Sequence, residues 1–392
     1  MKKYDFDEIV DRHHTGALKI DAIKERWHRD DLLPMWVADM DFKTPPFIMD
    51  ALTKRCQHPI LGYTMRPDAW YDTICHWAKQ RYGWNISRKN VGFVPGVVTG
   101  IAHALKCFTS PGDKVLIQPP VYHPFRMVVK ANQCELVNSQ LAVKDERFYI
   151  DFDRFSNDIK GCKAFILCNP HNPGGRVWSR EELERIAHIC YENHVLVLSD
   201  EIHCDLTYSE YTHIPFASVS LEAAQNSITF MAPSKTFNCA GLGSSQYIII
   251  NEELGERYGE YLENNEMNEG HLFAYIPVLE AFTPAGEEWL GEALEYIKEN
   301  VSFTQGFLHE HMPLVDMMVP EASYLIFIDF RKLELSQTDL VHFIEDEAHL
   351  ALNSGTLFGP GGEGFMRLNA GTPRSILEQA LNQLNEAYNK RF

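Results

Sequence analysis

Short apolar runs alternate with longer helix-like stretches between about residues 50 and 250, and this alternation restricts the possible folds more than any other feature. Six runs are predicted as strands, at 91–94, 114–118, 164–168, 195–199, 228–231 and 246–250. Strands that alternate with helices are typical of an α/β fold, because each helix returns the chain so that the next strand can lie parallel to the last. The sequence therefore predicts a central sheet that is mostly parallel.

The helix-like stretches predict a second, smaller domain. Apolar residues repeat on one face of 181–190, with Ser179 placed as its N-cap, and on one face of a longer stretch at 287–309 that we expect to join two domains. Beyond it, strands at 324–328 and 365–368 and helices at 338–348 and 373–391 indicate an α+β unit, against which the first fifty residues are expected to pack. We predict a large domain at 50–286 and a small domain built from 1–49 and 287–392.

Composition limits the setting in which the chain works. A chain of 392 residues with 45% hydrophobic content can bury one large and one smaller core. Its nine cysteines include no Cys-x-x-Cys pair, which favours a reducing cytoplasm, and no export signal or membrane-spanning run is apparent. A net charge of −18 disfavours binding to nucleic acid or to an anionic membrane, so an anionic ligand needs a local positive site.

One such site is predicted where the strand at 91–94 ends. Pro95 and Gly96 lead into a helix, so the backbone amides of Val97, Val98 and Thr99 would point at an anion. The hydroxyls of Thr99 and Ser234 could add donors. Taken alone, this pattern is more often an ordinary glycine turn with an N-cap threonine.

Four polar or aromatic residues follow predicted strands and together indicate pyridoxal phosphate. Lys235 lies beside a hydroxyl after the strand at 228–231 and is suited to forming a Schiff base, and Asp200 could keep a pyridine nitrogen protonated, which helps the ring accept electrons released at a substrate Cα. Asn172 could hydrogen-bond the ring's phenolic oxygen, and Tyr122 could stack on the ring. Singly, each has a simpler explanation: a surface turn for Lys235, a cap for Asp200, a turn residue for Asn172 and core packing for Tyr122.

Three motifs in order give the chain a family resemblance. Asn-Pro-His-Asn-Pro-Gly-Gly at 169–175, Ser-Asp-Glu-Ile-His at 199–203 and Pro-Ser-Lys at 233–235 resemble the class I and II aminotransferase superfamily, the fold type I pyridoxal phosphate enzymes, over nearly the full length. Within it, the segments 34–42, 119–122 and 367–369 are similar to the cystathionine β-lyase subgroup of carbon–sulfur lyases.

The resemblance implies roles for matching residues. Lys235 would hold the cofactor covalently, Asp200 would pair with its pyridine nitrogen, and Asn172 and Tyr122 would contact the phenolic oxygen and the ring face. Arg367 would bind the substrate's α-carboxylate through a two-pronged ion pair, although without the family it would be interpreted as a surface salt-bridge residue. Tyr63 matches a tyrosine that reaches the phosphate from the neighbouring subunit, which implies a homodimer with shared active sites; a buried core tyrosine is the alternative.

The chain departs from the superfamily pattern at two positions. Gly243 stands where the typical aminotransferase has an arginine that neutralises the phosphate, so that charge would depend on the helix terminus, hydroxyl groups and Tyr63. His203 stands where many relatives have tyrosine, and it would either serve the phenolic oxygen or fill space.

The implied activity is α,β-elimination of L-cystathionine, or of related S-substituted cysteines, to a thiol such as homocysteine, pyruvate and ammonia, as in methionine biosynthesis. The alternatives are an aminotransferase and a non-catalytic regulatory or binding protein on the same fold. The glycine-rich segment 359–364 is interpreted as a turn rather than a dinucleotide loop, and the histidine pairs lack metal-site spacing, so we expect no metal.

Overall fold

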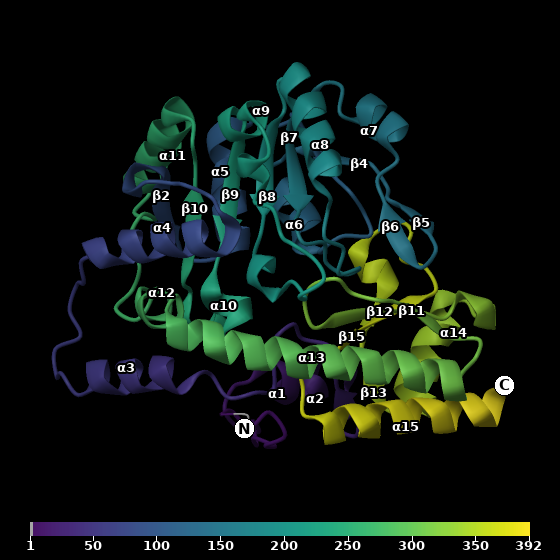
Figure 1. Cartoon of the computed structure of the whole chain (residues 1–392). Coiled ribbons are helices and arrows are strands. Elements are labelled where there is room, and N and C mark those ends of the chain that lie inside the picture. The colour runs from purple at the N-terminus through teal and green to yellow at the C-terminus, as the bar shows by residue number, and fades with distance from the viewer. Residues whose placement is uncertain (1–2) are drawn as a thin grey trace.

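A seven-stranded sheet dominates the computed structural model, which describes residues 3–392 (Figure 1). Its strand order is β2–β10–β9–β8–β7–β3–β4. The strands are β2 (Val91–Val94), β3 (Lys114–Ile117), β4 (Glu135–Asn138), β7 (Cys162–Cys168), β8 (Leu196–Asp200), β9 (Ser227–Met231) and β10 (Ser245–Ile248). Only β10 runs antiparallel to its neighbours in this sheet. The prediction of an α/β fold with a mostly parallel sheet is confirmed.

All six predicted strands form, with ends shifted by a residue or two, and the sequence pattern missed β4. That strand lies at the sheet edge, where Glu135 and Asn138 are exposed and the two residues between them are only partly buried. A short edge strand with polar ends lacks the continuous apolar run of a central strand, so its pattern resembles a loop.

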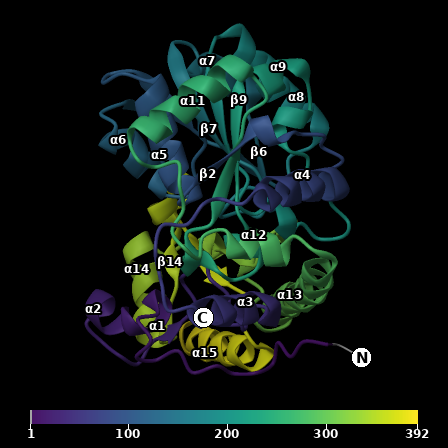
Figure 2. The ribbon, with the colours of Figure 1, turned by 90° about the vertical axis from the view of Figure 1, so that its left-hand side faces the viewer.

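Helices cover both faces of this sheet (Figure 2). Alternate strand residues point to opposite faces, so that Leu116 and Phe165 join one core while Val115 and Ala164 join the other. The first core is closed by α7 (Phe152–Asp158), α8 (Arg180–Glu192) and α9 (Leu221–Gln225), and the second by α5 (Val97–Phe108), α6 (Pro124–Ala131) and α11 (Glu252–Asn264). As predicted, Ser179 caps α8: its Oγ accepts a hydrogen bond from the Glu182 amide at 3.2 Å.

A four-stranded antiparallel sheet lies beside the 28-residue helix α13 (Pro284–His311) (Figure 1). Its order is β11 (Asp316–Met318), β12 (Leu325–Asp329), β15 (Phe365–Asn369) and β14 (Asn353–Ser354). The helix α15 (Arg374–Arg391) follows, whereas the helix predicted at 338–348 is shorter: α14 (Gln337–His342) passes into a π-helical turn, Phe343–Glu347.

The N-terminal residues lie against this C-terminal part of the chain. β1 (Leu33–Pro34) pairs in parallel with β13 (Leu350–Ala351), and the Trp27 indole donates to Glu345 at 2.7 Å.

The domain limits at 49/50 and 286/287 stay a prediction. The remaining α-helices and strands are α1 (Leu18–Asp21), α2 (Ile23–Trp27), α3 (Pro46–Cys56), α4 (Asp68–Tyr82), β5 (Ala142–Lys144), β6 (Arg147–Tyr149), α10 (Pro233–Thr236) and α12 (Ile276–Ala281). Within residues 3–392, none of the helices has both the length and the apolar content needed to span a membrane.

Candidate active site

Lys235 lies in the short helix α10, directly after β9, and its side chain enters a small cavity at the carboxyl ends of the central strands. The cavity is lined by Ala38, Val98, Tyr122, Cys168, Asn172, Asp200, Ile202, His203 and Lys235. The Lys235 ammonium donates to the backbone carbonyl of Ala38 at 2.7 Å. Burial lowers the pKa of Lys235 to about 8, because a cation loses hydration there. The amine can therefore gain or lose a proton near neutral pH.

Asp200 is the last residue of β8 and is buried in the wall of the same cavity. Its Oδ1 accepts a hydrogen bond from the Ile202 amide at 3.1 Å. Burial raises the pKa of Asp200 to about 7, while the Ile202 hydrogen bond and the charge of Lys235 act in the opposite direction. A cation placed beside this carboxyl group would stabilise its charged form.

Arg367, on β15, places a buried guanidinium against Asn172, which lines the cavity. Its Nη1 donates to Asn172 Oδ1 at 3.1 Å, and its Nη2 donates to the Trp36 carbonyl at 3.0 Å and to Asn353 Oδ1 at 2.8 Å. All three acceptors are neutral, the Nε is buried without a partner, and no carboxylate among residues 3–392 forms an ion pair with Arg367. Burial lowers its pKa to about 10. The site therefore contains a buried cation whose charge is not balanced by a contacting acid.

Tyr122 and His203 complete the walls. Burial raises the pKa of Tyr122, with the nearby charge of Asp200 adding to the effect. Burial and the charges of Lys235 and Arg367 lower the pKa of His203 to about 3, so its imidazole is neutral. The His203 Nδ1 is buried without a hydrogen-bond partner, which leaves it able to interact with a ligand.

The predicted anion site lies at the first turn of α5. Gly96 is its N-cap and no side chain caps the helix, so the amides of Val97, Val98 and Thr99 have no partner within the helix. Val98 lines the cavity that contains Lys235, and Ser234 precedes the lysine and is buried. The N-terminal end of a twelve-residue helix therefore meets the cavity, as an anionic group would require.

Tyr63, unlike the predicted residues that line this cavity or adjoin its walls, lies apart from it in a single chain. Its side chain is fully exposed, and it lines a separate cavity formed by residues 61–66 and 269–273 with Asp68 and Tyr71. The alternative of a buried core tyrosine is wrong. Its predicted role toward a neighbouring subunit stays a prediction.

The sequence pattern did not identify the groups that hold the two site cations in place. They are the backbone carbonyls of Trp36 and Ala38 and the side chain of Asn353. Residues 36–39 form a strap whose remaining carbonyls, of Val37 and Asp39, accept hydrogen bonds from the Asn369 amide. Residues 34–42 and 367–369 belong to the motifs that carry the family resemblance. However, every residue has a backbone carbonyl, so the sequence does not show which carbonyls accept hydrogen bonds from the site cations.

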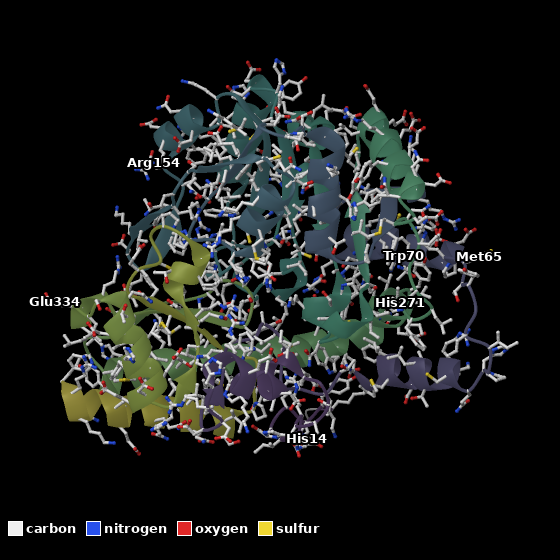
Figure 3. All side chains as sticks on the ribbon, turned by 180° about the vertical axis from the view of Figure 1, so that it is seen from behind. His14, Met65, Trp70, Arg154, His271 and Glu334 are labelled. Atoms are coloured by element: carbon white, nitrogen blue, oxygen red, sulfur yellow. The ribbon has the colours of Figure 1, made fainter. Side chains whose placement is uncertain are left out.

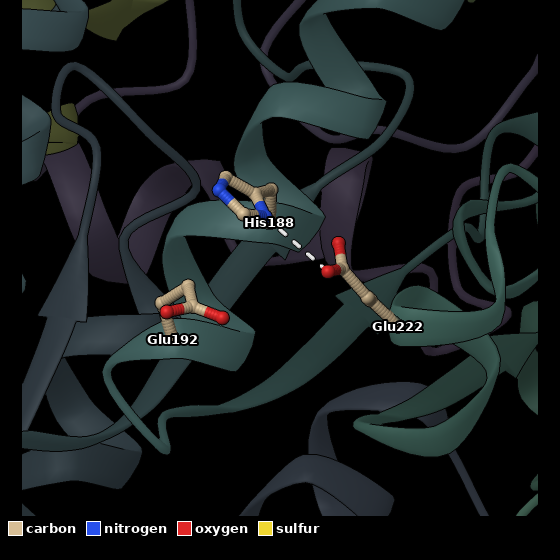
Figure 4. A group of neighbouring side chains, drawn as sticks. All are labelled: His188, Glu192 and Glu222. Carbon is tan, nitrogen blue, oxygen red and sulfur yellow. Dashed lines mark hydrogen bonds and ion pairs between the residues drawn. The ribbon is translucent and has the colours of Figure 1, made fainter.

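One group of side chains has ligand atoms close enough for a metal ion among the described residues (Figure 4). It comprises His188 and Glu192 on α8 and Glu222 on α9, whose ligand atoms lie within 4.8 Å of one another. His188 Nδ1 already pairs with Glu222 Oε1 at 3.2 Å, and His188 and Glu192 are exposed. An ordinary surface ion pair accounts for this arrangement.

The residues around Lys235 fit pyridoxal phosphate. An amine, an acid, an aromatic ring and a helix N-terminus face one cavity, and Asn172 uses its Oδ1 toward Arg367, which leaves its Nδ2 available as a donor. The unpartnered polar atoms of Arg367 and His203 add further contacts for a polar ligand.

Comparisons with known proteins place the chain in a family. The model for aminotransferase class I and II matches residues 31–384. Cystathionine beta-lyase PatB of Bacillus subtilis (strain 168) is 42% identical over 384 residues, which are 97% of this chain and 99% of PatB. Cystalysin from Treponema denticola, whose crystal structure contains pyridoxal 5'-phosphate, is 34% identical with a TM-score of 0.95 and 99% coverage of both chains. The PLP-bound C-S lyase from Staphylococcus hominis is also 34% identical, with a TM-score of 0.91 and 98% coverage of both chains. This chain therefore belongs to the class I and II aminotransferase family.

Proposed function

We propose that this chain is a pyridoxal phosphate-dependent carbon–sulfur β-lyase. It takes L-cystathionine, or related S-substituted cysteines, and produces a thiol, pyruvate and ammonia; from cystathionine the thiol is homocysteine. The observation that carries the proposal is the buried Arg367 guanidinium with only neutral partners, in contact with Asn172 in the cavity wall that contains Lys235 and Asp200. A substrate carboxylate would supply the missing anion, and the lysine lies close to where that substrate's Cα would be.

Each residue then has a defined task. When bound, the cofactor's protonated ring accepts the electron pair left at Cα as its proton departs. Asp200 holds a proton at the pyridine nitrogen, and Lys235 removes the Cα proton with its amine, whose pKa of about 8 suits both removal and return of a proton. Arg367 and Asn172 fix the carboxylate, which orients the Cα–H bond toward Lys235.

Elimination breaks one C–H bond and one C–S bond and forms one carbon–carbon double bond. The Cα–H bond breaks with its proton passing to Lys235, the Cβ–S bond breaks with its electron pair leaving on sulfur, and a Cα–Cβ double bond forms. The sulfur takes up a proton as the thiol leaves, and water hydrolyses the remaining three-carbon fragment to pyruvate and ammonia. The partly buried Tyr122 and the buried His203 would limit the access of bulk water to the reacting carbons before this step.

An assay with L-cystathionine, run with and without an added keto acid, tests the proposal. We expect thiol and pyruvate to form in equal amounts without the keto acid, and the Lys235→Ala variant to lose at least about a thousandfold in kcat because it lacks the covalent anchor and the base. Amino-group transfer that depends on the keto acid and releases no thiol would instead identify an aminotransferase. A purified protein that binds no pyridoxal phosphate would indicate a non-catalytic binding or regulatory role.

We further propose that the enzyme acts as a homodimer in the cytoplasm and serves methionine biosynthesis. The homocysteine released from cystathionine supports the last point. All nine cysteines are free thiols in the structure, which suits a reducing compartment. The dimer is supported by the exposed apolar side chains of Ile60, Leu61, Tyr63 and Met65, which follow one another on a single extended segment.

A further inference from the structure

We propose that His271 is a phosphate-binding residue of this chain, with its Nε2–H donating to the phosphate of the bound cofactor beside Gly243. The inference rests on the proposed function, because it concerns the cofactor's phosphate. Gly243 stands where the typical aminotransferase has a phosphate-binding arginine. In this chain, His271 would supply a donor to the phosphate from another part of the sequence.

The phosphate needs such a donor because the first turn of α5 offers no cation. A phosphate monoester carries a charge of about −1.5 to −2 at neutral pH. The helix begins with Val97, Val98 and Thr99, so its own contribution is limited to backbone amides, the helix dipole and one hydroxyl. A side-chain N–H donor would add a further hydrogen bond to the phosphate beyond those that these groups supply.

Position 243 is unsuited to a side chain. Gly243 has φ +55°, in the left-handed region that favours glycine, and a Cβ added there would lie 3.2 Å from the Pro95 carbonyl oxygen. The same Cβ would lie 3.5 Å from Nε2 of His271. The imidazole therefore lies in the space that an arginine side chain at 243 would enter.

The same contacts place His271 beside the anion site. Pro95 immediately precedes Gly96, the N-cap of α5, and three residues separate Pro95 from Thr99. Gly243 thus lies close both to His271 and to Pro95, two residues before α5 begins, although the three come from separate parts of the sequence. His271 also lines the cavity that contains Tyr63. In Figure 3, His271 lies on the same flank of the molecule as Trp70 and Met65.

The local hydrogen bonds orient the imidazole as a donor. The Phe273 amide donates to His271 Nδ1 at 3.3 Å, so the proton of a neutral ring is on Nε2, the atom that faces Gly243. The nearest acid along the chain, Glu269, already accepts from the Tyr275 hydroxyl at 2.7 Å and lies 3.6 Å from Arg66. Within residues 3–392, no carboxylate forms an ion pair with His271, which leaves its Nε2–H for a phosphate.

The test compares cofactor binding with and without the phosphate group. The full-length enzyme is stripped of cofactor and titrated with pyridoxal 5'-phosphate and, separately, with pyridoxal, while absorbance and protein fluorescence are followed. We expect His271→Ala to raise the Kd for pyridoxal 5'-phosphate roughly tenfold to hundredfold and to leave the Kd for pyridoxal within about twofold. His271→Gln, which keeps an N–H donor at a similar distance, should recover much of the loss.

The exposed His188, which pairs with Glu222 and lies far along the sequence on α8, provides the matched control. His188→Ala should bind both compounds as the wild type does. If His271→Ala binds pyridoxal 5'-phosphate as tightly as the wild type, or if it weakens both compounds equally, His271 does not bind the phosphate. If the wild type itself binds neither compound, the proposed function fails, which is a different result.

Discussion

At the scale of single residues, the site contains buried ionisable side chains whose charges are not balanced by ion pairs within the protein. Lys235 and Asp200 have pKa values moved toward neutrality by burial, to about 8 and about 7, and Arg367 contacts only neutral acceptors. Such an arrangement costs folding stability and is typical of sites that meet a charged ligand. The cofactor and substrate would contribute the opposite charges.

Removing the charge of Asp200 should therefore stabilise the protein in the absence of cofactor. The pKa of Asp200 is raised from 3.8 to about 7, so its cost is fully present above pH 7 and disappears as the pH falls from 7 toward 4. We expect Asp200→Asn, stripped of cofactor, to gain roughly 2 to 4 kcal/mol at pH 8 and little near pH 4. Urea unfolding across this range measures it, with the exposed Asp50→Asn as control; a gain that is the same at every pH would contradict the assignment.

The geometry of Arg367 should matter as much as its charge. Arg367→Lys keeps a cation but loses the planar pair of donors, so we expect kcat/KM for L-cystathionine to fall by about a hundredfold, with most of the effect on KM. Steady-state kinetics measure the two terms. The surface variant Arg154→Lys should match the wild type. An unchanged KM in Arg367→Lys would exclude the carboxylate role.

The sequence predicted which side chains would meet but not how they are held. Lys235, Asp200 and Asn172 each stand in a motif just at or after the end of a parallel strand, and parallel strands bring such ends together. Arg367 lies instead in the middle of β15, in the antiparallel sheet, and only its motif pointed to the site. The carbonyls of Trp36 and Ala38 could not be predicted, because their role depends on how the N-terminal segment crosses the cavity.

At the scale of elements, the position of α5 on the sheet determines where the anion site lies. Gly100 allows the close approach of helix and sheet: a Cβ there would lie 2.7 Å from the Phe230 ring on β9 and 3.1 Å from Val94 on β2. The Gly100 carbonyl also accepts from the Tyr258 hydroxyl at 2.7 Å. The absence of a side chain at Gly100 therefore lets α5 pack closely on the sheet, and this packing sets the position of the helix's first turn.

Substitution of this glycine should displace α5 from the sheet. We expect Gly100→Ala to lower stability by about 1 to 3 kcal/mol through overpacking and to weaken pyridoxal 5'-phosphate binding. Gly291→Ala is the matched control, because Gly291 is exposed in α13 and an added Cβ meets nothing within 4 Å. That variant should be stabilised by about 0.5 to 1 kcal/mol. Thermal unfolding and cofactor titration distinguish the two, and equal effects would contradict the packing argument.

Element prediction succeeded where burial is continuous and failed where it is not. The central strands β8 and β9 are buried along their whole length and could be recognised as apolar runs, whereas β4 is half exposed. The reversed direction of β10 has no signature in its residues, because direction depends on the connection from β9. The π-helical turn after α14 buries Phe343 and Ile344, as an α-helix there would also be expected to do, so the apolar pattern does not distinguish the two.

At the scale of the whole molecule, one chain does not use all the residues predicted for its site. Tyr63 and its apolar neighbours project from an extended segment between α3 and α4, and this segment contributes nothing to the cavity that contains Lys235. Exposed apolar side chains in sequence are typical of a surface that a partner covers. A second copy of the chain, related by twofold symmetry, could receive Tyr63 at its phosphate.

Mixing two impaired variants tests this arrangement. In a dimer formed from Lys235→Ala and Tyr63→Ala subunits, one of the two sites keeps both residues. Unfolding and refolding an equal mixture should therefore restore activity to about a quarter of the wild-type value, because half of the dimers are mixed. Analytical ultracentrifugation checks that the species is a dimer. Failure to regain activity in confirmed mixed dimers would show that Tyr63 acts within its own subunit, and a Tyr63→Ala enzyme as active as the wild type would show that Tyr63 has no role in the site.

The strap at residues 36–39 also bears on ligand selection. Arg367 donates to the Trp36 carbonyl of this strap, so an incoming carboxylate must exchange that established hydrogen bond for a new one. A small fatty acid gains one ion pair for that exchange, whereas an α-amino acid also gains the reaction of its amino group at the cofactor. The strap should thus act as a filter against the simple carboxylates abundant in a cell, and inhibition by acetate or propionate should need far higher concentrations than inhibition by a slowly reacting amino acid.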